Sequence, residues 1–331
     1  MSADTNRSNP LDRVLSIEIA RVTERAAVAA ALWRGRGDER AADQAAVDAM
    51  RQELDKLDVD GEIVIGEGER GEASSLFIGE SVGNPEGPGV DIALDPLEGT
   101  TICAKNLPNA LTVIAIAAKG SLLKAPDVYM EKIAIGPGYP ADLVNLEQSA
   151  TENLTAMAKA KGVPVSRITA CILDRPRHAK LIEEIRTLGA SIRLIGDGDV
   201  AGVIHTTDPE ETGIDVYMGI GGAPEGVLAA AALRCTGGQM QCRLQLNTNE
   251  KRARAEEMGV FDPYRIYTLE DLAGGDVIFA ATGVTDGNLL DGVRIYANRI
   301  ETHTLVMRSY SHTVRDIRAR HYNRGKFGVE V

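Results

Sequence analysis

The stretch Val90-Asp91-Ile92-Ala93-Leu94-Asp95-Pro96-Leu97-Glu98-Gly99-Thr100 joins an apolar segment to a polar turn. The apolar part, Val90–Leu94, predicts a strand, and the turn that follows carries two carboxylates and a hydroxyl. Mg²⁺ and Mn²⁺ prefer oxygen ligands, and Asp95, the Leu97 carbonyl and Glu98 would supply three of them. The alternative is an acidic turn that only caps the next segment, since acidic residues beside proline and glycine are common in turns. The motif alone therefore indicates a metal site as a hypothesis.

Three further carboxylates fall at the expected ends of other elements. Asp43 begins a predicted helix, Glu67 follows a short predicted strand, and Glu225 precedes another predicted helix. Each residue by itself is explained equally well by a helix-terminal charge or a solvated loop. Convergence of all three with Asp95 and Glu98 would imply about two divalent cations, because like charges repel unless cations separate them. Two cations suit phosphoryl transfer, since one activates water while the other stabilises the leaving oxygen.

Three loops carry groups suited to a phosphorylated sugar. The Arg175-Pro176-Arg177 segment would hold a phosphate with two guanidinium groups, or would form an ordinary basic surface loop. The Asp197-Gly198-Asp199 segment would accept hydrogen bonds from sugar hydroxyls, or would cap the next helix. Gly221-Gly222 would offer backbone N–H groups to a phosphate, or would form a plain tight turn.

Composition limits the class of protein. The chain has 331 residues, enough for about two domains, and 44% of them are apolar. Its net charge of −12 argues against a nucleic-acid or anionic membrane surface, which needs clustered lysine and arginine. The four cysteines show no metal-ligand or disulfide spacing, and no stretch is long enough to span a bilayer. We expect a reduced cytoplasmic protein with a disordered tail at residues 1–10.

Periodicity predicts an α/β fold. Helical spacing covers residues 11–33 and 43–57, strands are expected at 62–65, 90–94 and 128–135, and residues 110–117 with 121–123 suggest a hairpin. From residue 168 onward strands and helices alternate, which is typical of a layered α/β unit. We therefore predict an N-terminal α/β metal-binding subdomain at residues 11–165 and a C-terminal α/β substrate-binding subdomain at 166–331, closely packed together.

Seven motifs taken in order closely resemble class II fructose-1,6-bisphosphatase, a branch of the lithium-sensitive phosphatase superfamily. These are Gly35-Arg36-Gly37-Asp38, Ile65-Gly66-Glu67-Gly68-Glu69, Asp95-Pro96-Leu97-Glu98-Gly99-Thr100, Ala125-Pro126-Asp127-Val128-Tyr129-Met130, Arg175-Pro176-Arg177-His178, Asp197-Gly198-Asp199 and Gly221-Gly222-Ala223-Pro224-Glu225-Gly226. The resemblance implies a layered αβαβα sandwich of the sugar-phosphatase type. It also implies Mg²⁺- or Mn²⁺-dependent hydrolysis of the 1-phosphate of fructose 1,6-bisphosphate to fructose 6-phosphate, by a cytoplasmic homodimer or homotetramer.

The resemblance also assigns roles to residues. Asp43 and Glu67 match ligands of one metal, while Asp95, Glu98, Glu225 and the Leu97 carbonyl match ligands of the second. The catalytic set is Thr100, whose hydroxyl would orient the attacking water, with Glu67 and Asp43. The residues that would contact the sugar bisphosphate are Glu98, Gly99, Thr100, Tyr129, Arg175, Pro176, Arg177, Asp197, Gly198, Asp199 and Gly222.

Two features refine this expectation. Where the family commonly has lysine after the Gly-Arg-Gly-Asp motif, this chain has Glu39, so a positive charge is missing there, and whether Arg40 replaces it is left open. The segments Ala150-Thr151-Glu152-Asn153-Leu154 and Asp174–His178 resemble the branch that also hydrolyses sedoheptulose 1,7-bisphosphate. The alternatives are another superfamily phosphatase, of the inositol monophosphatase or nucleotide 3′-phosphatase type, and a non-catalytic sugar-phosphate sensor.

Overall fold

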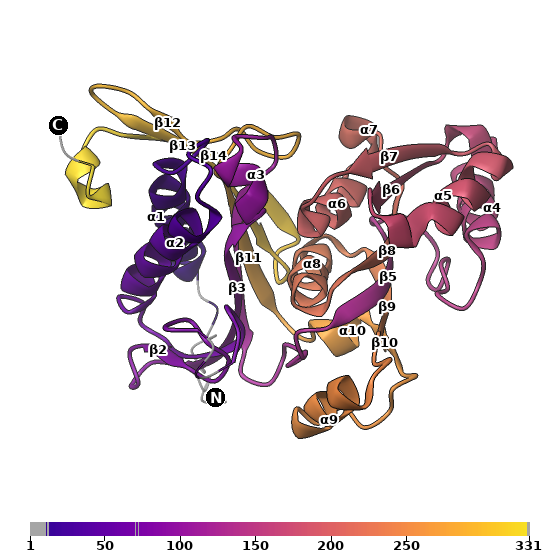
Figure 1. Cartoon of the computed structure of the whole chain (residues 1–331), viewed down its shortest axis with the longest axis horizontal. Coiled ribbons are helices and arrows are strands. Elements are labelled where there is room, and N and C mark those ends of the chain that lie inside the picture. The colour runs from indigo at the N-terminus through magenta and orange to yellow at the C-terminus, as the bar shows by residue number, and fades with distance from the viewer. Residues whose placement is uncertain (1–10, 12, 70, 72, 330–331) are drawn as a thin grey trace, which may run out of the picture.

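The computed structural model describes residues 11, 13–69, 71 and 73–329, which form two β-sheets and three layers of helices (Figure 1). The predicted tail at residues 1–10 lies outside the described residues. No helix in the described part of the chain is long and apolar enough to cross a membrane. The α-helices are α1 (Leu15–Ala31), α2 (Glu39–Leu54), α3 (Thr100–Ala104), α4 (Ala150–Lys161), α5 (Ala179–Leu188), α6 (Asp199–Ile204), α7 (Pro209–Thr212), α8 (Ala223–Thr236), α9 (Asn249–Glu257) and α10 (Leu269–Leu272).

Both sheets are mixed. The larger sheet has the order β12-β13-β11-β4-β3-β1-β2, with β14 on β13. Its strands are β1 (Asp60–Ile65), β2 (Ser81–Gly83), β3 (Gly89–Glu98), β4 (Leu111–Ala118), β11 (Val277–Gly283), β12 (Arg294–Ile295), β13 (Ile300–Arg308) and β14 (Thr313–His321). The smaller sheet has the order β10-β9-β5-β8-β6-β7. Its strands are β5 (Tyr129–Ile135), β6 (Thr169–Leu173), β7 (Ser191–Ile195), β8 (Val216–Gly222), β9 (Gln239–Leu244) and β10 (Ile266–Thr268).

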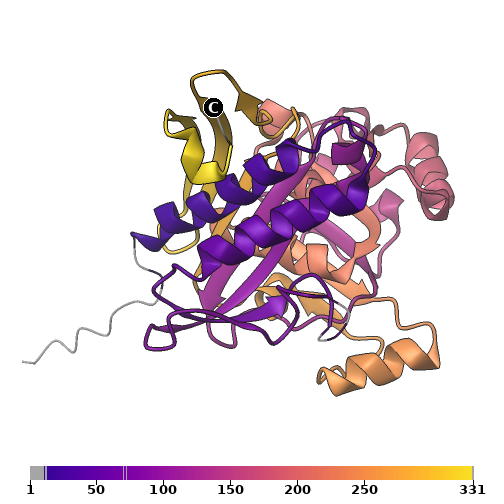
Figure 2. The same ribbon diagram turned by 60° about the vertical axis from the view of Figure 1, so that its left-hand side comes forward.

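Apolar packing fixes the order of the layers. Helices α1 and α2 lie side by side against one face of the larger sheet (Figure 2), and α4 and α5 cover the outer face of the smaller sheet. Helix α8 lies between the two sheets, where it contributes to a core shared by both. The predicted α/β sandwich is confirmed, with layers in the order αβαβα.

Helix α8 can occupy the middle layer because of its composition. It is apolar all round and rich in alanine, and Ala229, Ala230, Ala231 and Ala232 are buried. A helix without a polar face must be buried on every side, and small side chains let two sheets approach it closely. The helix begins at Ala223 with Pro224 in its first turn. Glu225 therefore also lies in the first turn, at the N-terminal end of this buried helix.

The predicted boundary near residue 165 does not coincide with the division between the sheets. Strand β5, which precedes it, belongs to the smaller sheet, and β11 to β14, which follow it, return to the larger sheet. The chain returns to the larger sheet after residue 165 because β11 pairs with β4, whose other neighbour is β3. The division into two functional subdomains stays a prediction.

Most predicted elements are present, and two predictions were wrong. Asp43 does not begin its helix, because the Asp38 carboxylate accepts a hydrogen bond from Ala41 N at 3.0 Å and starts α2 at Glu39. Residues 121–123 do not form a hairpin with β4. Leu122 donates its N–H to the Asp91 carboxylate at 3.1 Å and bridges to Ala273 instead.

A pH-dependent stability follows from His205, at the end of α6. The ring is buried, and both nitrogens lack a hydrogen-bond partner among the described residues. Burial, with a smaller effect of Arg193, lowers the pKa of His205 from 6.5 to about 4. Between pH 7 and 5 the imidazole of His205 becomes protonated in the unfolded chain but stays neutral in the folded chain. The free energy of unfolding therefore falls by roughly 2 kcal/mol as the pH drops from 7 to 5.

Chemical denaturation of wild type and His205→Phe at several pH values measures this dependence. We expect the variant, which keeps a ring at the same place, to lose that part of the pH slope. Equal slopes in the two proteins would show that His205 is not responsible.

Candidate active site

A cavity of about 440 Å³ opens between the two sheets and receives side chains from both halves of the chain. All six residues predicted to hold metals line it: Asp43, Glu67, Asp95, Leu97, Glu98 and Glu225. Asp43 comes from α2, Glu67 from the turn after β1, Asp95 and Glu98 from β3, and Glu225 from α8. The elements that were separate in sequence therefore share one cavity.

A bulge in β3 brings Asp95 and Glu98 together. The predicted turn is part of the strand, which continues to Glu98 with a shift of register. Asp95 pairs with Val113 and Glu98 with Leu111, so three steps along β3 match two along β4. In a regular strand residues three apart face opposite sides, but the extra residue restores a common face.

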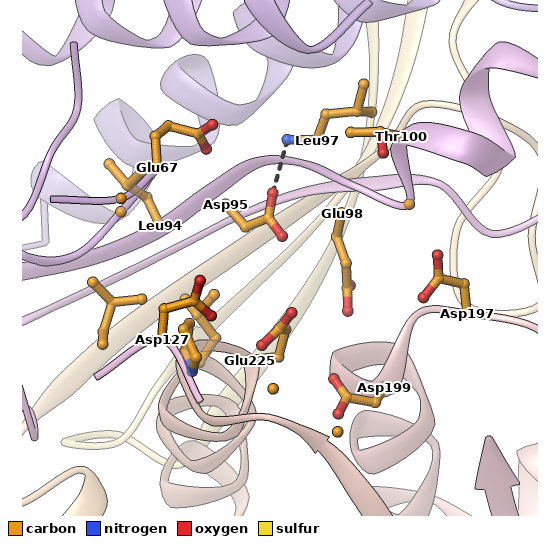
Figure 3. A pocket seen from close by; sticks show the side chains of 18 of the residues that line it. Glu67, Leu94, Asp95, Leu97, Glu98, Thr100, Asp127, Asp197, Asp199 and Glu225 are labelled. Carbon is orange, nitrogen blue, oxygen red and sulfur yellow. Dashed lines mark hydrogen bonds between the residues drawn. The ribbon is translucent and has the colours of Figure 1, made fainter. Parts of the chain in front are cut away.

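Hydrogen bonds fix this bulge. Leu97 donates its N–H to the Asp95 carboxylate at 3.0 Å, as Figure 3 shows, and the Thr112 hydroxyl donates to the Pro96 carbonyl at 2.9 Å. Pro96 has no N–H to leave unpaired, which suits a position where the ladder is interrupted. The Asp95 carboxylate is therefore held in place by the backbone N–H of Leu97, two residues further along the same strand.

The two carboxylates of β3 are strongly desolvated. Burial, followed by the charges of Glu67 and Glu225, raises the pKa of Asp95 well above its ordinary value. Burial, followed by Asp199 and Asp95, does the same to the pKa of Glu98. Each carboxylate thus disfavours ionisation of the others, which is the behaviour of a cluster that lacks positive charge.

The remaining members of the cluster behave in the same way. Burial and the Asp43 charge raise the pKa of Glu67 to about 7. Burial and the Asp199 charge raise the pKa of Glu225 to about 7, against the opposing effect of Lys132. Burial also raises the pKa of Asp43.

Two oxygen atoms of this cluster are suited to a cation. Glu98 Oε2 and Glu225 Oε2 are buried and have no hydrogen-bond partner among the described residues. A buried carboxylate oxygen without a donor is costly, and a divalent ion satisfies it. Within the described ranges no three acidic, histidine or cysteine side chains already form a closed metal site, so the ligands would have to close on the ion. The set of donors, all of them oxygen, fits Mg²⁺ or Mn²⁺.

Gly222 makes room for the Glu225 carboxylate. A Cβ atom at residue 222 would lie 1.8 Å from Glu225 Oε2, so only glycine leaves the carboxylate its present place. Gly222 also caps α8 with an extended backbone, at φ −66° and ψ 149°.

The predicted phosphate-binding residues lie mainly on the same cavity. The Arg177 guanidinium donates two hydrogen bonds to the Ile220 carbonyl, at 3.0 and 2.7 Å, and lies over the Tyr129 ring. Arg175 faces Asp197 with 3.7 Å between the charged atoms. Arg175, Arg177, Tyr129 and Asp197 all line the cavity.

Two of the predicted contact residues are absent from the lining. Pro176 begins a 3₁₀ turn between Arg175 and Arg177, which do line the cavity, and Gly198 is the left-handed cap of α6 at φ 82°. The other predicted contact residues, Gly99, Thr100, Asp199 and Gly222, line the cavity with Glu98. Gly99 caps α3 at φ 87°, a conformation that favours glycine, and Thr100 follows it as the first residue of that helix.

The substitution at Glu39 lies outside this site. Glu39 and Arg40 are exposed in the first turn of α2, and neither lines the cavity. The charge that differs from the family pattern therefore does not contact the carboxylate cluster in this structure.

Sequence reasoning missed four residues at or beneath the site. Asp127, Glu69 and Arg254 line the cavity, and Arg254 of α9 forms an ion pair with Glu69 across the gap between the two sheets. Lys132 lies buried beneath the cavity and bonds to Asp199. Glu69 and Asp127 lie within two of the quoted motifs, and Lys132 carries a signal of its own, because a lysine among apolar residues on the inward face of a strand must be paired.

Comparison with known proteins agrees with this arrangement. A family model described as bacterial fructose-1,6-bisphosphatase, glpX-encoded, matches residues 13–321. A Synechococcus protein (strain JA-3-3Ab) named D-fructose 1,6-bisphosphatase class 2/sedoheptulose 1,7-bisphosphatase is 43% identical, over 96% of this chain and 98% of that protein. Escherichia coli K12 fructose-1,6-bisphosphatase 1 class 2 is 46% identical, over 94% of this chain and 96% of that protein. Because the match spans nearly the whole chain, this protein belongs to the bacterial class II fructose-1,6-bisphosphatase family.

Proposed function

We propose that this protein hydrolyses the 1-phosphate of fructose 1,6-bisphosphate, releasing fructose 6-phosphate and phosphate, with about two Mg²⁺ or Mn²⁺ ions in each site. Family membership supports the phosphatase activity and the sugar bisphosphate substrate. The observation that carries the metal-dependent mechanism is the convergence of Asp43, Glu67, Asp95, Glu98 and Glu225 on one cavity.

In this proposal Asp43 and Glu67 hold one ion, while Asp95, Glu98, Glu225 and the Leu97 carbonyl hold the other. When bound, such ions lower the pKa of water and stabilise the leaving oxygen. The hydroxyl of Thr100, which begins α3 and lines the cavity, orients the attacking water.

The other wall of the cavity binds the rest of the substrate. Arg175 and Arg177 contact a phosphate through charge-assisted hydrogen bonds, and Asp197 and Asp199 accept hydrogen bonds from sugar hydroxyls. Tyr129 supports the Arg177 guanidinium, whose centre lies 4.7 Å from the middle of the ring. The positive charges of these arginines would offset the negative charge that the substrate phosphate brings into an already acidic cavity.

Sedoheptulose 1,7-bisphosphate is a second candidate substrate, favoured by the name of the Synechococcus relative. The segment at residues 150–154 that resembles that branch begins α4 in the outer layer, where Thr151 donates to Glu184, so it does not contact the cavity. Any discrimination between six- and seven-carbon sugars is therefore made by other residues. We also propose a cytoplasmic homodimer or homotetramer, which light scattering would test.

The reaction is tested by phosphate release from both bisphosphates, with and without Mn²⁺. We expect turnover of fructose 1,6-bisphosphate only with a divalent ion, and at a higher kcat/KM than inositol monophosphate or a nucleoside 3′-phosphate. Preference for either of those compounds would favour the rival phosphatase activities. Tight binding of the bisphosphate without release under any divalent ion would favour a sensor.

Replacement of Asp95 by asparagine should abolish this activity. The change removes a ligand charge and leaves the shape, and we expect kcat to fall by more than about 100-fold, since even an outer-shell partner of a metal ligand is worth 10- to 100-fold. Asp48→Asn, which changes an exposed carboxylate on α2, serves as the control and should retain wild-type turnover. Near-normal turnover of Asp95→Asn at saturating Mn²⁺ would remove Asp95 from the mechanism.

Glu67→Gln should stabilise the metal-free protein while weakening its response to metal. Burial and Asp43 raise the pKa of Glu67 from 4.5 to about 7, so its charge destabilises the folded state once the pH exceeds both values. At pH 8.5 the variant should gain roughly 2–3 kcal/mol of unfolding free energy over wild type. Added Mn²⁺ should raise the melting temperature of wild type more than that of the variant.

The exposed Glu86→Gln is the matched control for this measurement. It should change neither the stability of the metal-free protein nor the shift caused by Mn²⁺. A Glu67→Gln protein that is less stable than wild type without metal, and equally stabilised by Mn²⁺, would contradict the assignment of Glu67 as a ligand.

A further inference from the structure

Lys132 is a charged residue in an apolar position. It lies on β5 between Met130 and Ala134, which share its face of the strand and belong to the core between the two sheets. Its side chain is 1% exposed. A buried ammonium is expensive unless it is paired, so its partners explain its presence.

The Lys132 ammonium joins two segments that carry site residues. It donates to Asp199 Oδ2 at 2.5 Å and to the Gly222 carbonyl at 2.6 Å. Asp199 is the first residue of α6, and Gly222 is the cap of α8, the helix that carries Glu225. One buried cation thus ties β5, α6 and α8 together beneath the cavity.

Asp199 is left with one oxygen for another partner. Lys132 and the Tyr217 hydroxyl, at 3.4 Å, both contact Oδ2. Oδ1 makes no hydrogen bond within the described residues, and the side chain lines the cavity on the same side as Glu225 (Figure 3). The carboxylate is therefore fixed through one oxygen and presents the other to the space where a substrate would lie.

The shape of the neighbouring backbone is adapted to this ion pair. A Cβ atom at Gly221 would lie 1.9 Å from Asp199 Oδ2 and 3.1 Å from Lys132 Nζ. The first turn of α6 is also bonded to the carboxylate cluster, because Val200 donates its N–H to Glu98 Oε1 at 3.1 Å. Movement of Asp199 would consequently be opposed from both sides.

We propose that Lys132 is a positioning residue, which holds the Asp199 carboxylate so that Oδ1 accepts hydrogen bonds from sugar hydroxyls of the substrate. This inference rests on the proposed function, because it assumes a sugar phosphate in the cavity. Lys132 itself contacts no substrate and acts through Asp199. Its removal should weaken recognition of the sugar more than attack on the phosphorus atom, which takes place at the carboxylate cluster.

Two substrates separate these effects. Fructose 1,6-bisphosphate carries the sugar hydroxyls, whereas p-nitrophenyl phosphate offers only the phosphate ester. We expect Lys132→Met, which keeps most of the side-chain volume, to lower the ratio of kcat/KM for the two compounds by about 10- to 100-fold, mainly through KM for the sugar. Asp199→Asn should lower the same ratio, and the double variant should lose no more than the larger single loss, because both residues serve one contact.

Lys161→Met is the matched control. Lys161 also pairs with a buried carboxylate, Asp215, at 2.5 Å, although its own side chain is 36% exposed, and neither residue lines the cavity. Its replacement should leave the ratio unchanged. If Lys132→Met does not fold, Gly221→Ala, which crowds Asp199 Oδ2 and leaves residue 199 a carboxylate rather than an amide, gives the same test.

The outcomes distinguish this inference from the proposed function. If wild type does not hydrolyse fructose 1,6-bisphosphate with any divalent ion, the proposed function fails. If wild type is active but Lys132→Met loses equally on both compounds, Lys132 has only a structural role and the inference is wrong. Multiplying losses in the double variant would also overturn it, because they would show that the two residues act separately.

Discussion

Repulsion among closely grouped, desolvated carboxylates is the constraint on which this structure depends. Asp43, Glu67, Asp95, Glu98 and Glu225 share one cavity. Burial raises the pKa of every one of them, and the charges of other members add to the effect at Glu67, Asp95 and Glu98. Such a cluster destabilises the folded chain, so it persists only if the surrounding core is strong enough to hold it. The two carboxylate oxygens without a partner mark where cations would restore the balance. A fold selected for stability alone would have replaced these side chains with apolar ones.

The layered scaffold supplies the necessary rigidity. Helix α8 is enclosed by both sheets, and it delivers Glu225 at its N-terminal end, where the helix dipole favours negative charge. Asp95 and Glu98 lie on a strand with neighbours on both sides, β1 and β4. Asp95, Glu98 and Glu225 of the proposed metal ligands therefore come from heavily packed elements, while the arginines come from a loop. Under the proposed function this distribution would permit substrate preference to change without loss of the chemistry.

Sequence patterns could predict much of this arrangement but not its details. The apolar runs and the alternation after residue 168 predict the strands and helices, and every acidic residue chosen from the motifs lines the cavity. Spacing alone could not show the bulge in β3, because the register is set by pairing with β4. Asp38 competes with Asp43 as the start of α2, and only the cap geometry decides between them. The role of Lys132 was not predicted, because a single polar residue in a strand pattern does not show which residue it pairs with in the folded core.

The buried pair of Lys132 and Asp199 shows how the two sides of the cavity are connected. Val200 donates its N–H to Glu98, and Asp199 is the residue before Val200, so the first turn of α6 contacts one proposed metal ligand and carries one proposed sugar contact. The charge of Asp199 raises the pKa of Glu98, because the two carboxylates repel each other. Lys132 is bonded to Asp199 and offsets part of this repulsion from beneath the cavity. Under the proposed function one piece of backbone would set the positions of both the sugar hydroxyl and the metal ligand, and movement of either one would be transmitted to the other.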